Sequence, residues 1–412
     1  MSSRRAPDWF HPFQAFVRTE AFGGLLLLTC AVAALIIANF PWAPGYAAVW
    51  TMTLPPVGLP GHSLSLTVHQ WINDGLMALF FLLVGLEIKR ELLDGELASP
   101  RRASLPIAAA LGGMIVPAAL YLLIVRGDAS AVRGWGVPMA TDIAFALGAL
   151  SIMAPRAPAG LKVLLAALAI VDDMGAVIVI AIFYTGQLVW PAVAAAGAVS
   201  VALAALNASG VKRLAPYLVL GIALWIFVHE SGVHATIAGV VLAMTIPART
   251  SSRSTAGRSR AVEPEEEAPL VRLERSLHGV SAYLVMPLFA FANAGIELGG
   301  QIAAPKAVWG VAVGLALGKP IGITLASWLA VTARLASLPS GVTWAMLHGC
   351  AWLGGIGFTM SLFIATLAFD GTPLLASAKA GILTGSAAAG VVGAAALGRA
   401  TSARRPGASL AS

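Results

Sequence analysis

The sequence predicts an all-α polytopic membrane protein with about twelve transmembrane helices. Of its 412 residues, 58% are hydrophobic and only 11% are charged, whereas soluble domains carry about 25% charged residues. The apolar residues gather in long runs, and about 20 such residues cross a bilayer as a helix. A helix satisfies its own backbone hydrogen bonds in lipid, so each run is expected to be helical.

The first apolar run, 20–40, lacks a clear signal-peptide cleavage site and is expected to be the first span. The other runs are 70–90, 103–125, 134–153, 160–184, 189–207, 213–229, 232–247, 279–298, 306–333, 342–368 and 374–398. We therefore expect an amino-terminal segment (1–19), a single transmembrane domain (20–398) and a carboxyl-terminal tail (399–412).

The distribution of basic residues predicts the orientation. With twelve spans, 21 Lys and Arg residues fall on the side that holds both termini, and three fall on the other side. Cytoplasmic loops carry the excess of Lys and Arg, so both termini are expected in the cytoplasm. No basic domain or RNA-binding motif accompanies the net charge of +7, so no nucleic-acid partner is expected. The two cysteines, Cys30 and Cys350, have no metal-binding spacing.

Two polar segments interrupt the series of spans. Residues 43–67 are rich in Pro and Gly and include the alternating stretch SLSLTVH, which predicts a short outer hairpin. Residues 248–278 form the one long cytoplasmic loop, which is polar and is expected to be mobile.

Two spans are expected to be interrupted helices. The fourth places Pro138 just before Asp142, and the eleventh carries Gly354, Gly355 and Gly357. Gly and Pro in helix interiors favour breaks or kinks. Each is the second member of a group of three spans, and paired interrupted segments in matching halves indicate a transporter with an inverted repeat.

Four ionisable residues fall near the middle of spans: Asp142, Asp172, Asp173 and Lys319. Each costs roughly 2.5–3.5 kcal/mol at a helix centre, so each should face protein or water. Adjacent helical residues lie about 100° apart. One of Asp172 and Asp173 can therefore pair with Lys319 while the other faces Asp142. An architectural ion pair alone would leave two carboxylates unmatched.

A carboxylate pair without a fixed cation is a site for Na⁺ or H⁺, because hard ions prefer oxygen ligands. Protons and a metal cation then compete for the same oxygens, and this competition produces exchange if only loaded sites reorient. Half-helix ends carry partial charges, positive at amino ends and negative at carboxyl ends. The carboxylate of Asp142 could therefore compensate amino ends, and the ammonium of Lys319 could compensate carboxyl ends. The Thr141 hydroxyl could bind the cation, form a hydrogen bond with backbone groups freed by the break, or cap a helix.

At these positions the sequence resembles the NhaA-type sodium/proton antiporters. The matching stretches run in family order over residues about 20–398. They are WINDGLMALFFLLVGLEIKREL, ATDIAFALG, LAIVDDMGAVIVIAIFYT, SGVHATIAGV, PLFAFANAG, GKPIGI and GIGFTMSLFIATLAF.

The resemblance implies that Asp173 is the main Na⁺ ligand, that Asp172 pairs with Lys319, and that Asp142 and Thr141 lie at the break of the fourth span. Asp173 and Asp142 would hold the transported Na⁺ or Li⁺. The implied activity is electrogenic export of cytoplasmic Na⁺ or Li⁺ against entering protons, without a cofactor, in a bacterial inner (plasma) membrane. A homodimer held partly by the outer hairpin is also implied.

The resemblance further implies a pH-sensing cluster at the cytoplasmic mouth. The matching residues are Glu87, Arg90, Glu91, Glu274 and His278. This sequence departs from the family pattern at Arg275, where a histidine is expected, so the pH profile stays open. A solvated helix end is the alternative interpretation of the charges near Arg90.

Two other functions could use similar residues. An intramembrane aspartic protease needs two carboxylates on different helices, but the chain has no GxGD motif, and Lys319 would have no role. An ion-coupled transporter of an organic solute is the closer alternative, although no Arg lies in mid-span to bind an organic anion.

Overall fold

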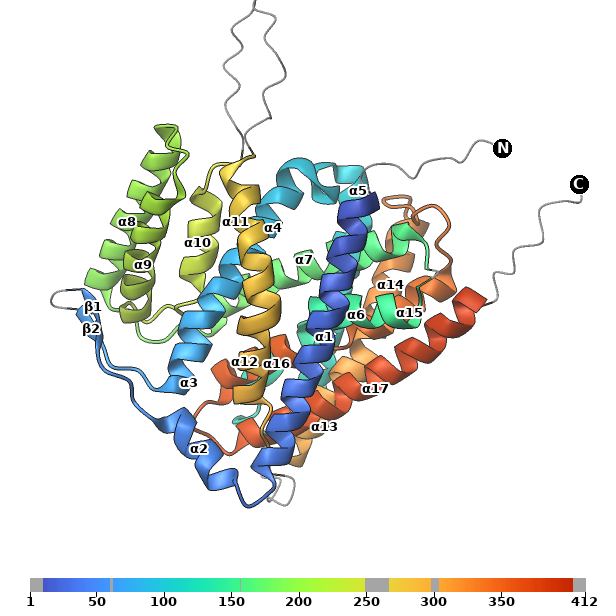
Figure 1. Ribbon diagram of the computed structural model, residues 1–412. Helices are drawn as coiled ribbons and strands as arrows, with labels where there is room; N and C mark the ends of the chain where they lie inside the picture. The colour runs from blue at the N-terminus through green and yellow to red at the C-terminus, as the bar shows by residue number, and fades with distance from the viewer. Residues whose placement is uncertain (1–9, 60–61, 156, 249–266, 298–303, 403–412) are drawn as a thin grey trace, which may run out of the picture. The chain divides into compact units, whose positions relative to one another are not determined.

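The computed structural model describes residues 10–59, 62–155, 157–248, 267–297 and 304–402, which are mostly helical (Figure 1). Of the short η elements, η2 and η3 are 3₁₀-helical, and η1, η4 and η5 are π-helical. The elements are α1 (Phe10–Ala38), α2 (Ala43–Thr51), β1 (Val57–Leu59), β2 (His62–Leu64), α3 (Val68–Gln70), η1 (Trp71–Leu76), α4 (Met77–Asp94), η2 (Glu96–Ala98), α5 (Pro100–Ile124), η3 (Val132–Met139), α6 (Ile143–Met153), α7 (Ala159–Phe183), α8 (Trp190–Ala208), α9 (Leu214–Glu230), α10 (Ile237–Thr245), α11 (Pro269–Val280), η4 (Ser281–Val285), α12 (Met286–Asn293), α13 (Pro305–Val313), η5 (Gly314–Gly318), α14 (Lys319–Thr332), α15 (Trp344–Gly354), α16 (Phe358–Phe369) and α17 (Leu374–Ser402).

The predicted fold class, an all-α polytopic membrane protein, is confirmed. Among the described residues, seven helices are long and apolar enough to cross a membrane, or up to nine if each bent pair is one span. The remaining predicted spans are shorter: α9 has 17 residues and α10 has nine. The ninth predicted span is divided between η4 and α12. Length and composition alone therefore support fewer than the twelve expected spans.

The chain forms two compact units. The first comprises the described parts of Met1–Ala47, Glu96–Val179 and Met286–Ser412, and the second comprises those of Ala48–Gly95 and Ile180–Val285. The prediction of one transmembrane domain over 20–398 stays a prediction.

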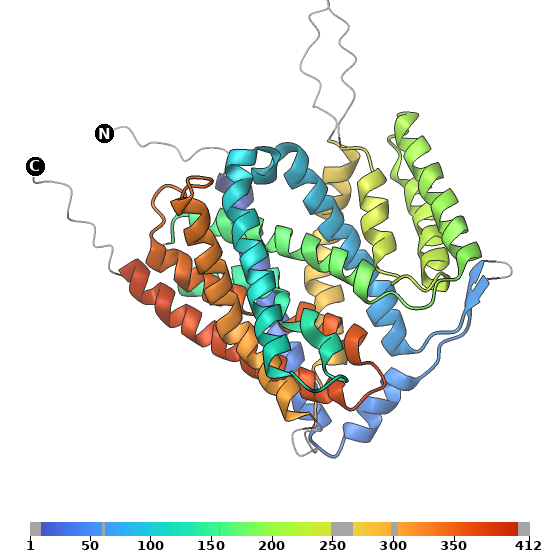
Figure 2. The same ribbon diagram turned by 180° about the vertical axis from the view of Figure 1, so that it is seen from behind.

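The first unit depends on a close crossing of α5 and α14, which lie side by side in Figure 2. Glycines face each other at the crossing. A Cβ added to Gly112 would overlap the carbonyl oxygen of Gly322, and a Cβ added to Gly322 would overlap that of Gly112. Small residues let helices approach closely, which is how helices associate in membranes. Lys319 at the start of α14 is thereby brought into the interior of this unit.

The second unit packs α4 against α10 in the same way. A Cβ added to Gly85 would lie 2.7 Å from the Cβ of Ala243. The helices α8 and α9 run beside each other within this unit (Figure 1). Its apolar core includes Leu86, Leu224 and Leu242, each at most 5% exposed.

The outer segment 43–67 is only partly a hairpin. The strands β1 and β2 are antiparallel, with Val57 opposite Leu64, as the alternating sequence predicts. Residues 43–51, however, form the helix α2. Their composition explains the difference, because three of the nine residues in APGYAAVWT are Ala, the strongest helix former, and a Pro lies in the first turn.

The prediction of a loop over 248–278 is wrong for residues 269–278, which are helical. Residues 249–266 lie outside the described residues, but α11 begins at Pro269. The buried residues Leu270 and Leu273 are three positions apart, while Arg272 and Arg275 are exposed. This spacing is typical of an amphipathic helix. The helix α1 begins at Phe10, within the predicted amino-terminal segment 1–19, whose cytoplasmic position stays a prediction.

Candidate functional site

Two interrupted helices of the first unit cross at their breaks. The helix η3 ends at Met139 and α6 begins at Ile143; α15 ends at Gly354 and α16 begins at Phe358. The α15–α16 pair is bent by 43°. The two breaks are joined where the Asp142 N–H donates to the Ile356 carbonyl oxygen at 2.7 Å. The interruption of the fourth and eleventh spans is therefore confirmed.

The glycines of the second break permit this crossing. A Cβ added to Gly355 would overlap the carbonyl oxygen of Leu315, and one added to Gly357 would lie 2.9 Å from the carbonyl oxygen of Ala140. Gly354 is the last residue of α15, and its carbonyl oxygen faces Thr141. Neighbouring backbone occupies the space that side chains would need.

Asp142 lies between the amino ends of two helices. Its Oδ1 accepts a hydrogen bond from the Phe145 N–H of α6 at 3.0 Å. Its Oδ2 accepts from the Thr359 N–H of α16 at 3.1 Å and also from the Thr359 hydroxyl. Each helix amino end carries about half a positive charge. Asp142 is thus placed where it compensates both, as the sequence predicts for the break.

Lys319 is fully buried, and its ammonium contacts two residues of the predicted site. Its Nζ lies 2.5 Å from Asp172 Oδ2 and donates to the Thr141 hydroxyl. Thr141 in turn donates to the Gly354 carbonyl oxygen at 2.8 Å. Of the three roles expected for Thr141, the structure shows a hydrogen bond to a backbone carbonyl oxygen that the break in α15–α16 leaves free. The Thr141 hydroxyl thereby links Lys319 to the carboxyl end of α15.

Asp173 follows Asp172 on α7 and is 2% exposed. Its charge also acts on the Lys319 ammonium. Inside the first unit, one carboxylate, that of Asp172, contacts the lysine, and a second, that of Asp173, is buried at the next position of α7. Within the described ranges, no group of three or more His, Cys, Asp or Glu side chains is close enough to hold a metal ion. Joint ligation of Na⁺ or Li⁺ by Asp173 and Asp142 stays a prediction.

Thr359 is the site residue that the sequence reasoning missed. Its side chain is fully buried and donates to Asp142. A sequence signal was available, because Thr359 is the second residue of the half-helix after the break at Gly357. The first backbone N–H groups of a helix have no partner within it, so a polar residue there often helps bind a charge.

The predicted pH-sensing residues lie on α4 and α11 of the second unit. Arg90 Nε lies 3.1 Å from Glu274 Oε1, and the Arg90 guanidinium lies 3.5 Å from Glu91 Oε1. Glu87 is one turn before Glu91 on α4, and His278 is one turn after Glu274 on α11. The Glu91 and Glu274 side chains are only 14% and 16% exposed, which argues against a fully solvated helix end.

Burial shifts the pKa values of Glu274 and His278 on α11. It raises the pKa of the Glu274 carboxyl, although Arg90 acts in the opposite direction. Burial also lowers the pKa of the His278 imidazole. Arg275, which departs from the family pattern, is exposed and donates to Glu267 at 3.1 Å instead of joining Glu274.

Helical spans with two crossing breaks, around buried carboxylates and a lysine, define a secondary transporter. The model of the family Na⁺/H⁺ antiporter 1 matches residues 14–397. The chain is 50% identical to the Na⁺/H⁺ antiporter NhaA of Bordetella parapertussis over 395 residues, which cover 94% of this chain and 96% of that protein. It is 49% identical to the protein of the same name from Rhodospirillum rubrum over 394 residues, with 93% and 96% covered.

The chain therefore belongs to the NhaA-type Na⁺/H⁺ antiporter family. It is a multi-pass membrane transporter rather than an enzyme, which removes the intramembrane protease from the alternatives.

Proposed function

We propose that the protein exports Na⁺ or Li⁺ in exchange for protons, using Asp173 and Asp142 as oxygen ligands that bind either cation or H⁺. The single observation that carries this proposal is the charge balance of the buried site. Asp172 is paired with Lys319, and Asp173, the next residue of α7, is buried beside this pair. These three groups therefore hold one net negative charge when all are ionised. A buried net charge needs a compensating ion or a proton.

The remaining compensation limits where the mobile ion binds. Asp172 accepts a hydrogen bond directly from the Lys319 ammonium, which also compensates its charge. Asp142 accepts hydrogen bonds from two helix amino ends, whose partial charges persist whether or not an ion is bound. Asp173 is then the carboxylate whose neutralisation completes the charge balance, with Na⁺, Li⁺ or a proton in that role.

Competition for these oxygens produces the exchange. Protonation expels the metal ion, and binding of the metal ion expels protons. If only loaded sites change the side to which they open, outward passage of Na⁺ is coupled to inward passage of protons. When Asp173 and Asp142 each take up a proton as Na⁺ leaves, two protons enter for each Na⁺ that is exported, and one net positive charge moves inward per cycle. We therefore propose electrogenic transport with alternating access.

Antiport can be measured in proteoliposomes that hold a pH gradient. Addition of NaCl or LiCl should collapse the gradient with the unchanged protein. With Asp173→Asn, which keeps the shape but removes the charge, the gradient should persist. Asp128→Asn is the matched control, because Asp128 lies in the turn after α5 and accepts its hydrogen bonds from Ser130 and Ala131 of the same turn. Normal exchange by Asp173→Asn would contradict the proposal, and uptake of an organic solute without ion exchange would favour the alternative function.

Electrogenicity has a separate test in the same vesicles. A K⁺ diffusion potential set with valinomycin should change the rate of Na⁺-driven proton movement. An electroneutral exchanger would show the same rate at every potential.

We further propose an inner-membrane location with both termini in the cytoplasm, a homodimer joined partly by β1 and β2, and transport without a cofactor. A reporter fused to the carboxyl end tests the orientation. Light scattering of a variant with a shortened hairpin tests the dimer, which should dissociate more readily. Transport by the purified protein with only salts and lipid added tests the last point.

A further inference from the structure

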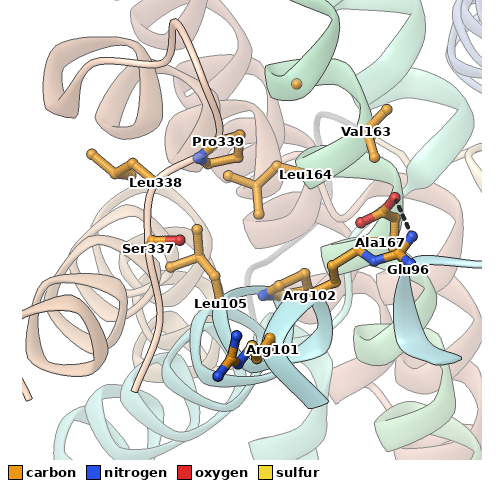
Figure 3. Close-up of a pocket in the computed structure, with 12 residues that line it drawn as sticks. Glu96, Arg101, Arg102, Leu105, Val163, Leu164, Ala167, Ser337, Leu338 and Pro339 are labelled. Atoms are coloured by element: carbon orange, nitrogen blue, oxygen red, sulfur yellow. Dashed lines mark ion pairs between the residues drawn. The ribbon is translucent and has the colours of Figure 1, made fainter. Parts of the chain in front are cut away.

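A cavity outside the transport site lies at the amino end of α5 in the first unit. Its volume is about 340 Å³, which is within the range of small-ligand sites. Figure 3 shows that the residues around it come from the first turns of α5, from one side of α7 and from the loop that follows α14. The residues that line it include Arg101, Arg102, Leu105, Leu164, Ser337 and Leu338.

The polar side of this cavity is positively charged. Arg101 and Arg102 are both exposed, and Glu96 supplies the one acidic side chain of the lining. The Arg102 guanidinium lies 3.8 Å from Glu96 Oε1, with side chains 63% and 38% exposed. A long, exposed ion pair contributes little, so an incoming anion can compete with Glu96 for Arg102.

The backbone at this position also favours an anion. The first turn of α5 contains no acidic residue, and the side chain of its N-cap residue, Ser99, makes no capping hydrogen bond. The 25-residue helix α5 therefore presents its partial positive charge toward the same end as the two arginines.

The opposite side of the cavity is apolar. Leu105 and Leu164 are at most 6% exposed, and Leu338 and Pro339 approach from the loop (Figure 3). A ligand that fills the cavity would thus combine a phosphate, which guanidinium groups bind with two hydrogen bonds, with an apolar part. Basic pockets at the cytoplasmic ends of transmembrane helices bind the head groups of anionic lipids.

We propose that this cavity binds a phosphate group, supplied by the head group of an anionic phospholipid whose acyl chain lies along the half-buried side chains of Val163 and Leu338. The proposal depends on the membrane location of the chain and not on the antiport mechanism. Val163, which lines the cavity, is nine residues before Asp172 on α7, or about 13 Å along the helix. A bound lipid would connect α5, α7 and the loop after α14, and would stabilise the unit that holds the transport site.

The test measures the melting temperature of the purified full-length protein in detergent. Phosphatidylglycerol is added to one sample, phosphatidylcholine with the same acyl chains to a second, and inorganic phosphate to a third. Phosphatidylglycerol should raise the melting temperature more than phosphatidylcholine. The double variant Arg101→Gln, Arg102→Gln should bind it about 30-fold more weakly, from about one factor of five for each arginine near the membrane surface.

Arg272→Gln is the control variant, because Arg272 is exposed on α11 and also loses one positive charge; its response to phosphatidylglycerol should not change. An equal shift with inorganic phosphate, lost in the double variant, would support the phosphate site with a soluble source. A lipid response that the double variant retains in full would overturn the proposal.

Discussion

Removal of the Lys319 ammonium should leave a buried carboxylate without its counter-charge. Lys319 is fully buried and Asp172 is 1% exposed, with 2.5 Å between Nζ and Oδ2. Breaking a buried ion pair from one side costs about 3–5 kcal/mol, because the remaining charge stays out of water. We expect Lys319→Met, which keeps an unbranched side chain of similar length, to lower the free energy of unfolding by this amount.

The free energy of unfolding can be measured by SDS titration in mixed micelles. The control is Lys306→Met, because Lys306 is exposed and donates only to the Arg126 carbonyl oxygen at 3.3 Å. Exposed substitutions of this kind change stability by about 0.5 kcal/mol or less. Adding Asp172→Asn to Lys319→Met should recover most of the loss, because it removes the stranded charge.

Two results would refute this reasoning. If Lys319→Met were no less stable than Lys306→Met, the ion pair would not stabilise the fold. If the double variant were as unstable as Lys319→Met alone, the loss would come from packing and not from an uncompensated carboxylate.

Three further substitutions have defined outcomes in the same unfolding assay. Gly112→Ala should lower the free energy of unfolding by about 1–3 kcal/mol, because the added Cβ overpacks the crossing of α5 and α14. Gly197→Ala, whose added Cβ has nothing within 4 Å, should leave it unchanged or raise it. Thr359→Val should cost about 1.5–3 kcal/mol, because Asp142 loses a hydrogen bond to its charged form; an unchanged stability would contradict that contact. Burial raises the pKa of Glu274 above its ordinary value of 4.5. Between the unfolded-state pKa and the higher folded-state pKa, the folded protein therefore binds more protons than the unfolded chain. The free energy of unfolding should fall as the pH rises from about 4.5 through the folded-state pKa. Glu274→Gln should remove that fall, and a pH profile identical to that of the unchanged protein would contradict it.

The parts of the fold that depend on composition could be predicted from the sequence. Long apolar runs require helices in lipid, and Pro138 and Gly357 predict the two interruptions that the structure contains. The cost of a buried charge likewise predicts that Lys319 has an acidic partner. Burial cost alone did not decide between Asp172 and Asp173, because both lie in the same span at adjacent positions; only the family resemblance assigned Asp172 to Lys319.

Other features depend on distances that no local pattern contains. The contact of Thr359 with Asp142 joins residues 217 positions apart, and it exists only because two breaks cross at the same depth. The helix α11 was missed because the polar composition of 248–278 as a whole concealed the leucine spacing of its last part. The spans expected at α10 and α12 also differ from the structure, since non-helical residues 231–236 precede α10 and the π-helix η4 precedes α12.

The central claim is that Na⁺ and protons compete for the same buried carboxylates. The most direct measurement is the proton release that accompanies Na⁺ binding to the purified protein, obtained from binding calorimetry in buffers with different enthalpies of ionisation. We expect Na⁺ to displace protons from the unchanged protein and to displace none from Asp173→Asn. Binding of Na⁺ without proton release, or equal release by Asp173→Asn, would contradict it.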